Sequence, residues 1–422
     1  MKVNLHFDYR DVFRAARLGL AGKKVWIQFC GILFGYIVYL IFNYVAFLSK
    51  GMNIGEIWKL FGLFPLPFLG FPWFGWVIFG VGAAIALAIW LLASSAVAKI
   101  TYQELKGDDF YSVSDSLGFV KKNWKPVLFS PLTLIGMIVF FLAVGALIGL
   151  LAKVIPYVGE IGLSLIFGIP IVGAAVFTVF MAVVFLFSLI LGPAIVATTG
   201  EDTFETVIQL FSTIWNQPWR LVVYQIVLKF TQFLAVGVMA WFTVKGLKVI
   251  HLVMGWSMGD KLDKLLASAA GLLPKFHLPI LGESRLFPHF STLWANLGNP
   301  GPMVWTMDVA GIIIGITLIL IGFFIFAYGG AVINAGQTLI YLILRLKKDE
   351  ENLLERKEEE EEEETFPEEE EKEKKEEKKE EEKVEGEEEA REPKKTEGEK
   401  KPKKEEEEKP KKEGKKKEGE KK

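Results

Sequence analysis

Few residues in this chain could carry out chemistry, and they are widely spaced. Cys30 is the single cysteine and lies within an apolar run, so the pattern predicts neither a disulfide framework nor a thiolate metal site. The four histidines show no metal-ligand spacing. The carboxylate pairs Asp108-Asp109 and Glu201-Asp202 each precede a predicted helix, where helix capping accounts for them. We therefore predict no catalytic residue, no metal, no cofactor and no enzyme activity.

One polar stripe stands out within an apolar segment. Gln225, Lys229 and Gln232 are spaced to share one face of a helix. Polar groups inside a membrane are costly and often line a wet cavity, which makes this stripe a candidate transport or ion site. Alternatively, Lys229 snorkels to the cytoplasmic interface, or it is paired for structural reasons. Tyr36, Tyr39 and Asn43 share a face of the first apolar run and are candidate partners.

The elements that position this stripe are long apolar runs. A helix needs about 20 residues to cross the roughly 30 Å hydrocarbon layer of a membrane, and long unbroken runs favour helices over a β-barrel. Six runs qualify, and only the fifth contains a charge: Val25 to Leu48, Trp73 to Ala98, Val127 to Ala152, Ile161 to Thr199, Leu221 to Val244, and Val309 to Leu344. We predict an all-α, polytopic membrane bundle of about six transmembrane helices.

Two of these runs are longer than one crossing requires. Ile161 to Thr199 contains Pro170, which indicates either a kinked helix or a re-entrant piece followed by a span. We prefer the kinked helix, which gives six crossings. In the last run, Asn334 and Gln337 suggest that its end leaves the membrane as a helix.

Basic residues set the predicted orientation. With six crossings both termini lie on one side, which carries 15 flanking Lys and Arg residues against nine on the other. The positive-inside rule therefore places both termini in the cytoplasm of a protein in the cell membrane.

The chain also shows an internal repeat. A short amphipathic segment precedes the first, third and fifth runs, each followed by a tryptophan. We predict three pseudo-repeats of an amphipathic helix plus a helical hairpin, at about residues 1–102, 103–200 and 201–345. The amphipathic segments either lie among the lipid headgroups, with Val207 and Leu210 turned toward the acyl chains, or pack under the bundle as connectors. The predicted lipid-interface residues are Arg10, Arg14, Arg17, Trp26, Trp124 and Trp219.

Small residues at four-residue spacing predict close helix packing. Such sets are Gly145 with Gly149, Gly311 with Gly315, and Gly80 with Ala84 and Ala88. They support a compact bundle but do not specify an oligomeric state.

Two segments lie outside this plan. An outer loop at about 251–307 begins with an amphipathic helix near Met258 and is expected to fold over the outer mouth of the bundle. The segment 346–422 is a tail of Lys, Glu, Gly and Pro, which we predict to be mostly disordered. Positions 1–345 contain 23 basic and 15 acidic residues, which leaves 25 basic and 35 acidic in the tail. Such a mixture predicts a solvated spacer, or a contact with a cytoplasmic protein partner.

Two short elements accompany the repeated hairpins: Glu201-Asp202-Thr203-Phe204 and Asn216-Gln217-Pro218-Trp219. Together these features resemble the uncharacterised multi-pass proteins related to the membrane domain of glycerophosphodiester phosphodiesterases. The resemblance covers about residues 1–345. It implies a fold and a membrane location. The hydrolase of that family is a separate soluble domain, so no catalytic residue is carried over.

Two function classes remain. A membrane scaffold would bind lipids and organise partners through its interfacial helices and tail, whereas a transporter or channel would use the stripe at Gln225, Lys229 and Gln232. We prefer the scaffold, because three hairpins of one orientation do not give the inverted symmetry common in transporters. Membrane lipids are the expected partners, and no specific nucleic acid is predicted.

Overall fold

The computed structural model describes residues 5–66, 70–155, 157, 159, 161–162, 164, 168–270 and 304–355. Every regular element in these ranges is helical. Six helices are long and apolar enough to cross a membrane: Gly22–Ser49, Trp73–Lys106, Trp124–Val154, Ile169–Thr199, Pro218–Met258 and Trp305–Asp349. The predicted all-α, multi-pass membrane architecture is therefore confirmed.

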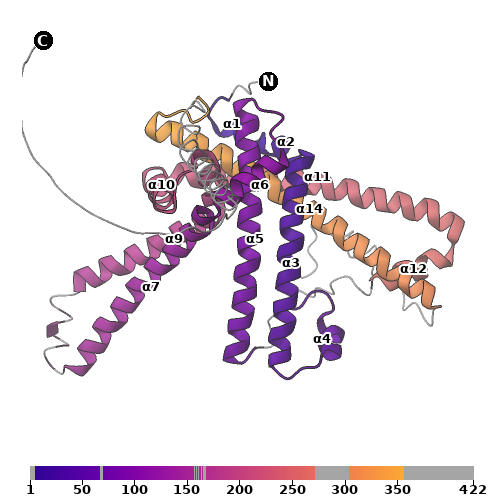
Figure 1. Ribbon diagram of the computed structural model, residues 1–422, viewed down its shortest axis with the longest axis horizontal. Helices are drawn as coiled ribbons and strands as arrows, with labels where there is room; N and C mark the ends of the chain where they lie inside the picture. Colours follow the sequence, from indigo (N-terminus) through magenta and orange to yellow (C-terminus); the bar gives the residue numbers. More distant parts are fainter. Residues whose placement is uncertain are drawn as a thin grey trace, which may run out of the picture. The chain divides into compact units, whose positions relative to one another are not determined.

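The helices follow one another with short connections. They are α1 (Tyr9–Val12), α2 (Ala15–Gly19), α3 (Gly22–Ser49), α4 (Ile54–Phe61), α5 (Trp73–Lys106), α6 (Val113–Lys122), α7 (Trp124–Val154), α9 (Gly168–Thr199), α10 (Thr203–Asn216), α11 (Pro218–Met258), α12 (Asp260–Ala270) and α14 (Trp305–Asp349). Short helices α2, α6 and α10 each precede a pair of long helices (Figure 1). That the three units are copies of one another stays a prediction.

The long helices pair as hairpins. α3 packs along α5, α7 packs along α9, and α14 packs with α11 and α12 (Figure 1). A single helix, α9, carries the fourth span. The residues before α9 lie largely outside the described ranges. The choice between a kinked helix and a re-entrant piece followed by a span therefore stays a prediction.

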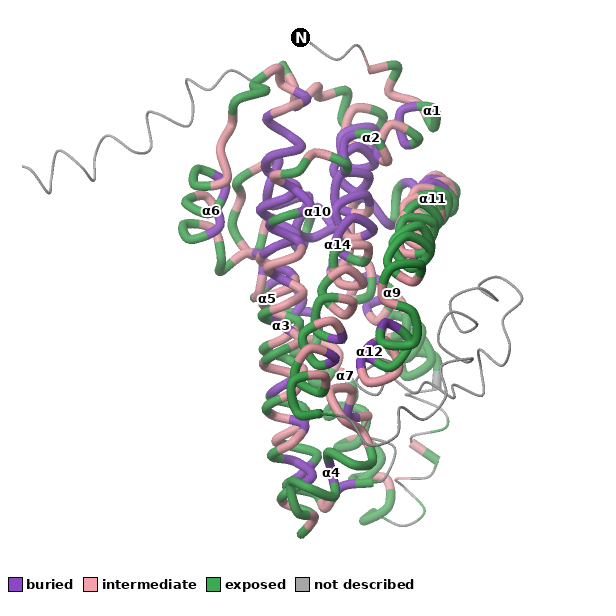
Figure 2. Tube along the Cα trace, turned by 90° about the vertical axis from the view of Figure 1, so that its right-hand side faces the viewer, coloured by how far each residue is buried: buried purple, intermediate pink, exposed green. Residues whose placement is uncertain are grey.

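The buried residues gather where the hairpins meet (Figure 2). The main core cluster combines the end of α5, the end of α9 and the second half of α14 with α2 and α10. At about 1.5 Å per residue, the 34 residues of α5 extend about 51 Å, well beyond a 30 Å hydrocarbon layer. The parts of these helices that exceed the thickness of the hydrocarbon layer therefore contribute the buried core residues.

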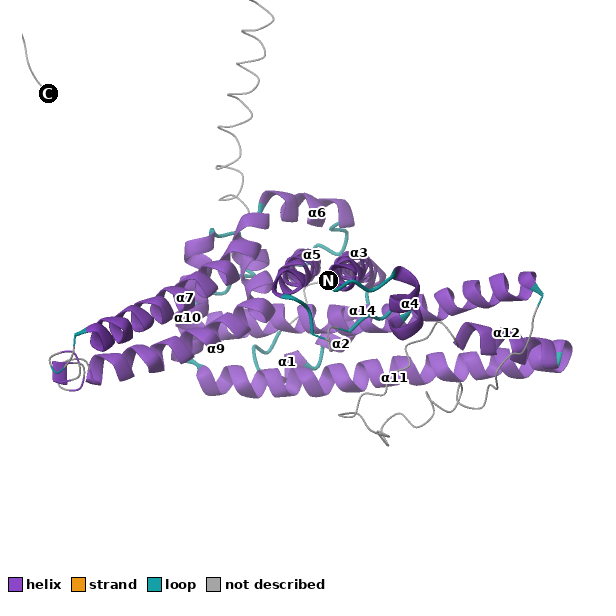
Figure 3. Ribbon diagram, turned by 90° about the horizontal axis from the view of Figure 1, so that it is seen from below, coloured by secondary structure: helices purple, strands orange, loops and turns teal. Residues whose placement is uncertain are grey.

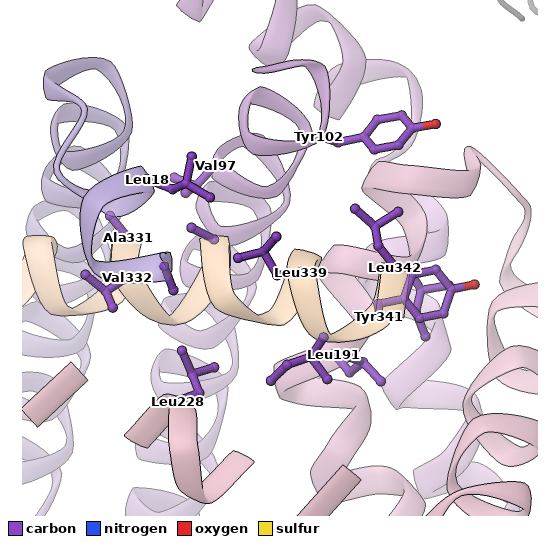
Figure 4. Packing of buried hydrophobic residues seen from close by; sticks show 14 of the residues in the cluster. Leu18, Val97, Tyr102, Leu191, Leu228, Ala331, Val332, Leu339, Tyr341 and Leu342 are labelled. Atoms are coloured by element: carbon purple, nitrogen blue, oxygen red, sulfur yellow. The ribbon is translucent and has the colours of Figure 1, made fainter. Parts of the chain in front are cut away.

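The second half of α14 forms the axis of this core. From Ala327 to Leu344 nearly every residue is buried, and Figure 4 shows Val332, Leu339 and Leu342 among side chains from neighbouring helices. α14 lies between the α3/α5 pair and α11 (Figure 3). Asn334 and Gln337, which suggested a helix leaving the membrane, are buried inside protein.

The amphipathic helix α10 turns its apolar face to the core. Val207 and Leu210 are buried in the main cluster, and Phe211 packs against the rings of Phe177 and Phe180 of α9. The expectation that Val207 and Leu210 face acyl chains is therefore wrong for this helix, because α9 and α14 offer a protein surface that covers them. The alternative, a connector packed within the bundle, describes α10 better.

The connection between α3 and α5 folds back onto α3. Tyr39 Oη and Asn43 Nδ2 both donate to the carbonyl oxygen of Pro65, at 3.0 and 3.1 Å, and Tyr36 donates to that of Leu63. Tyr36 lies 13 residues before the end of α3, so this irregular backbone reaches about 20 Å along the helix. The tyrosine face of α3 therefore binds a loop of its own hairpin, and the proposed pairing with Lys229 does not form.

Residues 251–258 of the predicted outer loop continue α11, and the predicted amphipathic helix follows as α12. Leu262, Leu265 and Ala269 are buried, and Ser268 lies against Gly311 of α14. α12 thus packs on the side of α14. Residues 271–303 of the predicted outer loop and 356–422 of the predicted tail lie outside the described residues.

Candidate functional site

The predicted polar stripe lies on the side of α11 that meets α14. Gln225 Nε2 donates to Gln337 Oε1 at 2.8 Å, and Gln337 Nε2 donates back to Gln225 Oε1 at 2.8 Å. An amide pair of this kind satisfies one donor and one acceptor on each side chain. The pair therefore joins the two helices and leaves these groups occupied by each other.

The stripe continues toward Gly329. Gln232 Nε2 donates to the carbonyl oxygen of Gly329 at 3.4 Å, and Lys229 Nζ lies 3.4 Å from Gln232 Oε1. Lys229 itself is exposed. The structure thus brings Gln225 and Gln232 together with α14, while the lysine stays at the edge of the contact.

A second amide pair joins α14 to α3 from the other side. Asn334 Nδ2 donates to Gln28 Oε1 at 2.9 Å, and both side chains are buried. Gln28 also lies directly against Gly330, where a Cβ atom would come within 2.8 Å of Gln28 Cγ. A larger residue at position 330 would push the two helices apart. We call Gln28, Gln225, Gln232, Asn334 and Gln337 the polar layer.

Trp26 indicates the membrane depth of the polar layer. Gln28 lies two residues after Trp26, or about 3 Å along α3. Gly330 contacts Gln28, and the neighbouring Gly329 binds Gln232. Exposed tryptophans favour the membrane–water interface. The layer and Lys229 therefore lie near the cytoplasmic interface in the predicted orientation, where an ammonium group reaches water and headgroups.

Ion pairs flank the layer, one of them around the buried Lys24, and sequence reasoning missed them. Lys24 is fully buried, and its Nζ lies 2.5 Å from Glu104 Oε2 of α5 and 3.0 Å from the carbonyl oxygen of Leu18. Arg345 pairs with Asp349 and Glu351 and also binds Gln209 of α10. From the sequence alone, Lys24 and Arg345 served only in the count of basic residues that predicts the membrane orientation. Glu104 lies on another helix than Lys24, so spacing along the chain could not reveal that pair, whereas Asp349 stands four residues after Arg345 on the same helix.

The predicted lipid-interface residues remain at the surface in part. Trp26, Trp124 and Trp219 expose 57%, 41% and 66% of their area. Arg10 and Arg17 are exposed, whereas Arg14 is half-buried beside Asp11, with Nη1 and Oδ1 3.4 Å apart. The three tryptophans and two of the three arginines therefore lie at the protein surface, and their contact with lipid stays a prediction.

The layer is built from amides, which neither titrate nor act as nucleophiles under ordinary conditions. Within the residues that the structure describes, no group of three or more His, Cys, Asp or Glu side chains could hold a metal ion. What the arrangement can do is fix α3, α11 and α14 in one register. The contact of Leu228 with Gly336 adds an apolar constraint to the same seam.

Comparison with known proteins returned no match. No family model, curated protein or solved structure is similar to this chain.

Proposed function

We propose that the protein is a multi-pass membrane scaffold in the cell membrane, with both termini in the cytoplasm. Its membrane domain contacts lipids through exposed tryptophans and arginines, and its charged tail meets a cytoplasmic protein partner. It carries no catalytic site in this proposal. The proposal includes the resemblance of this chain to the membrane domain of glycerophosphodiester phosphodiesterases.

The reciprocal bond between Gln225 and Gln337 carries the proposal. A transporter needs polar groups that are free to meet a solute within the membrane. Here the two amides are 2.8 Å from each other in both directions, and Gln232 binds backbone. Such bonds stabilise a helix contact, so they favour a rigid platform over a solute path.

A transporter or channel is the second candidate because Lys229 is an exposed cation on a membrane helix. If its ammonium lines a solute path, Lys229→Met should abolish transport and leave folding intact. If it only reaches the interface, the same change should leave both properties nearly unchanged.

The test combines flux and partner capture. Proteoliposomes of the parent protein and of Lys229→Met are compared for sodium, potassium, chloride and proton flux, with protein-free liposomes as the control. Crosslinked membranes of cells that express the full chain, or the chain ending at Glu355, are then analysed for bound proteins. We expect no flux above the control and a partner that depends on the tail. A flux that Lys229→Met removes would contradict the scaffold proposal.

A further inference from the structure

The residues directly after α14 are packed into the core. The chain turns at Glu350, which has a left-handed backbone with φ of 57°. Three residues later, Leu353 exposes only 2% of its area and belongs to the main core cluster. A leucine buried to this degree resists release, because its apolar area would have to return to water. The segment Glu350–Glu355 is therefore part of the folded unit.

Polar contacts hold this segment at Glu351 and at Leu353. Tyr102 of α5 donates from Oη to the carbonyl oxygen of Leu353 at 2.8 Å, and both residues are buried. The Arg345 guanidinium donates from Nε and Nη2 to Glu351 Oε2, at 3.1 and 2.9 Å. Charge-assisted bonds of this kind are stronger than neutral ones.

The same arginine also connects the segment to a third helix, α10. Arg345 binds Gln209 of α10, and Gln209 Nε2 donates to Glu205 Oε1 at 2.8 Å. The segment after α14 therefore connects α5, α10 and α14 through one guanidinium, one phenol and one buried leucine.

We propose that Glu350–Glu355 is a clasp that closes the cytoplasmic core, and that its release loosens the ends of α5 and α10. In sequence the clasp stands directly between α14 and the charged segment 357–422. A force applied to that segment therefore acts on the clasp before it reaches α14. This makes the clasp the switch through which an event in the tail alters the membrane domain.

Two truncations separate the clasp from the tail. A chain ending at Glu355 keeps the clasp, whereas a chain ending at Asp349 removes it. In detergent, we expect the first to keep the thermal midpoint of the full chain, and the second to lose roughly 5 °C or more. Equal midpoints for all three chains would overturn the proposal. Equal losses in both truncations would also overturn it, because the tail itself would then be the stabilising part.

Point variants keep the test usable if the shorter chain does not fold. Glu351→Gln removes one of the two carboxylate charges that pair with Arg345, and Glu355→Gln is its matched control, because Glu355 is an exposed carboxylate of the same segment that accepts from Asn352. Amide hydrogen exchange is followed in the full-length chain at residues 100–106 and 205–216. We expect Glu351→Gln to speed exchange there several-fold and Glu355→Gln to leave it unchanged. Unchanged exchange in Glu351→Gln would contradict the clasp.

Discussion

Two hairpins with similar glycine content differ in what their glycines contact. In the α3/α5 hairpin, a Cβ added at Gly31 would overlap that of Ala93, and one added at Gly35 would lie 3.2 Å from the carbonyl oxygen of Ala86. In the α7/α9 hairpin, Gly145 and Gly149 have no described atom within 4 Å of that position. Four-residue spacing of glycines therefore permits close packing without ensuring it. The partner helix decides which glycines are used.

The predicted contacts between small residues likewise form in some helices and not in others. Gly311 packs against α12, as the spacing predicts. The prediction is wrong for Gly145 with Gly149, and also for Gly80, beside which the structure places no described atom. Two positions further on, Gly82 faces Phe42 of α3 instead. A shift of two residues turns the contact to another side of α5.

The largest expected difference between the hairpins comes from Gly31→Leu and its matched control Gly145→Leu. The first inserts a side chain where two backbones touch, and overpacking of this kind costs about 1–3 kcal/mol or more. The second adds an exposed apolar side chain to a helix and should leave stability unchanged or slightly higher. Unfolding in mixed micelles by SDS titration measures both. Equal losses in the two variants would contradict the comparison.

Hydroxyl groups give a second, smaller contrast. Tyr39→Phe removes one of the two donors to the carbonyl oxygen of Pro65 in the α3/α5 hairpin, and the loss of this hydrogen bond should cost about 1 kcal/mol. Thr178→Val in α9 is the control, because the Thr178 hydroxyl donates to Ala174 of its own helix. Thermal midpoints in detergent should fall for Tyr39→Phe alone. A similar fall in both would show that the loop contact does not matter.

The smallest effect is expected at the capping box that begins α6, the helix leading into the second hairpin. Hydrogen bonds from Ser112 hold the pKa of the Asp115 carboxyl below its usual value. A lowered pKa in the folded state means that the bond stabilises the fold above the unfolded value of about 3.9. This contribution is lost as pH falls through the lowered folded value. Ser112→Ala should destabilise the fold slightly at neutral pH, and the difference from the parent should shrink below pH 4 in urea titrations. A difference independent of pH would contradict it.

Much of this architecture is predictable from composition. The apolar runs identify all six membrane helices, because length and lack of charge alone determine whether a helix can cross. The stripe on α11 is also visible, because Gln225, Lys229 and Gln232 stand out against apolar neighbours.

The partners of that stripe are not predictable in the same way. Gln337 pairs with Gln225 across 112 positions of sequence, and Lys24 pairs with Glu104 across 80. Periodicity describes one helix at a time, so it identifies the face but not the helix that meets it. For the same reason the burial of Leu353 could not be foreseen, since the residue follows the last apolar run and precedes a charged tail.

The most direct test of the scaffold account is a double-mutant cycle on Gln225→Leu and Gln337→Leu. If the polar layer fastens α11 to α14, each single change leaves an amide unpaired. The coupling free energy between the two sites should then be about 0.6–1.7 kcal/mol by SDS unfolding. Gln337→Leu with Lys229→Met should be additive within about 0.5 kcal/mol. Additive losses at Gln225 and Gln337, with strong coupling between Lys229 and Gln337, would contradict the account.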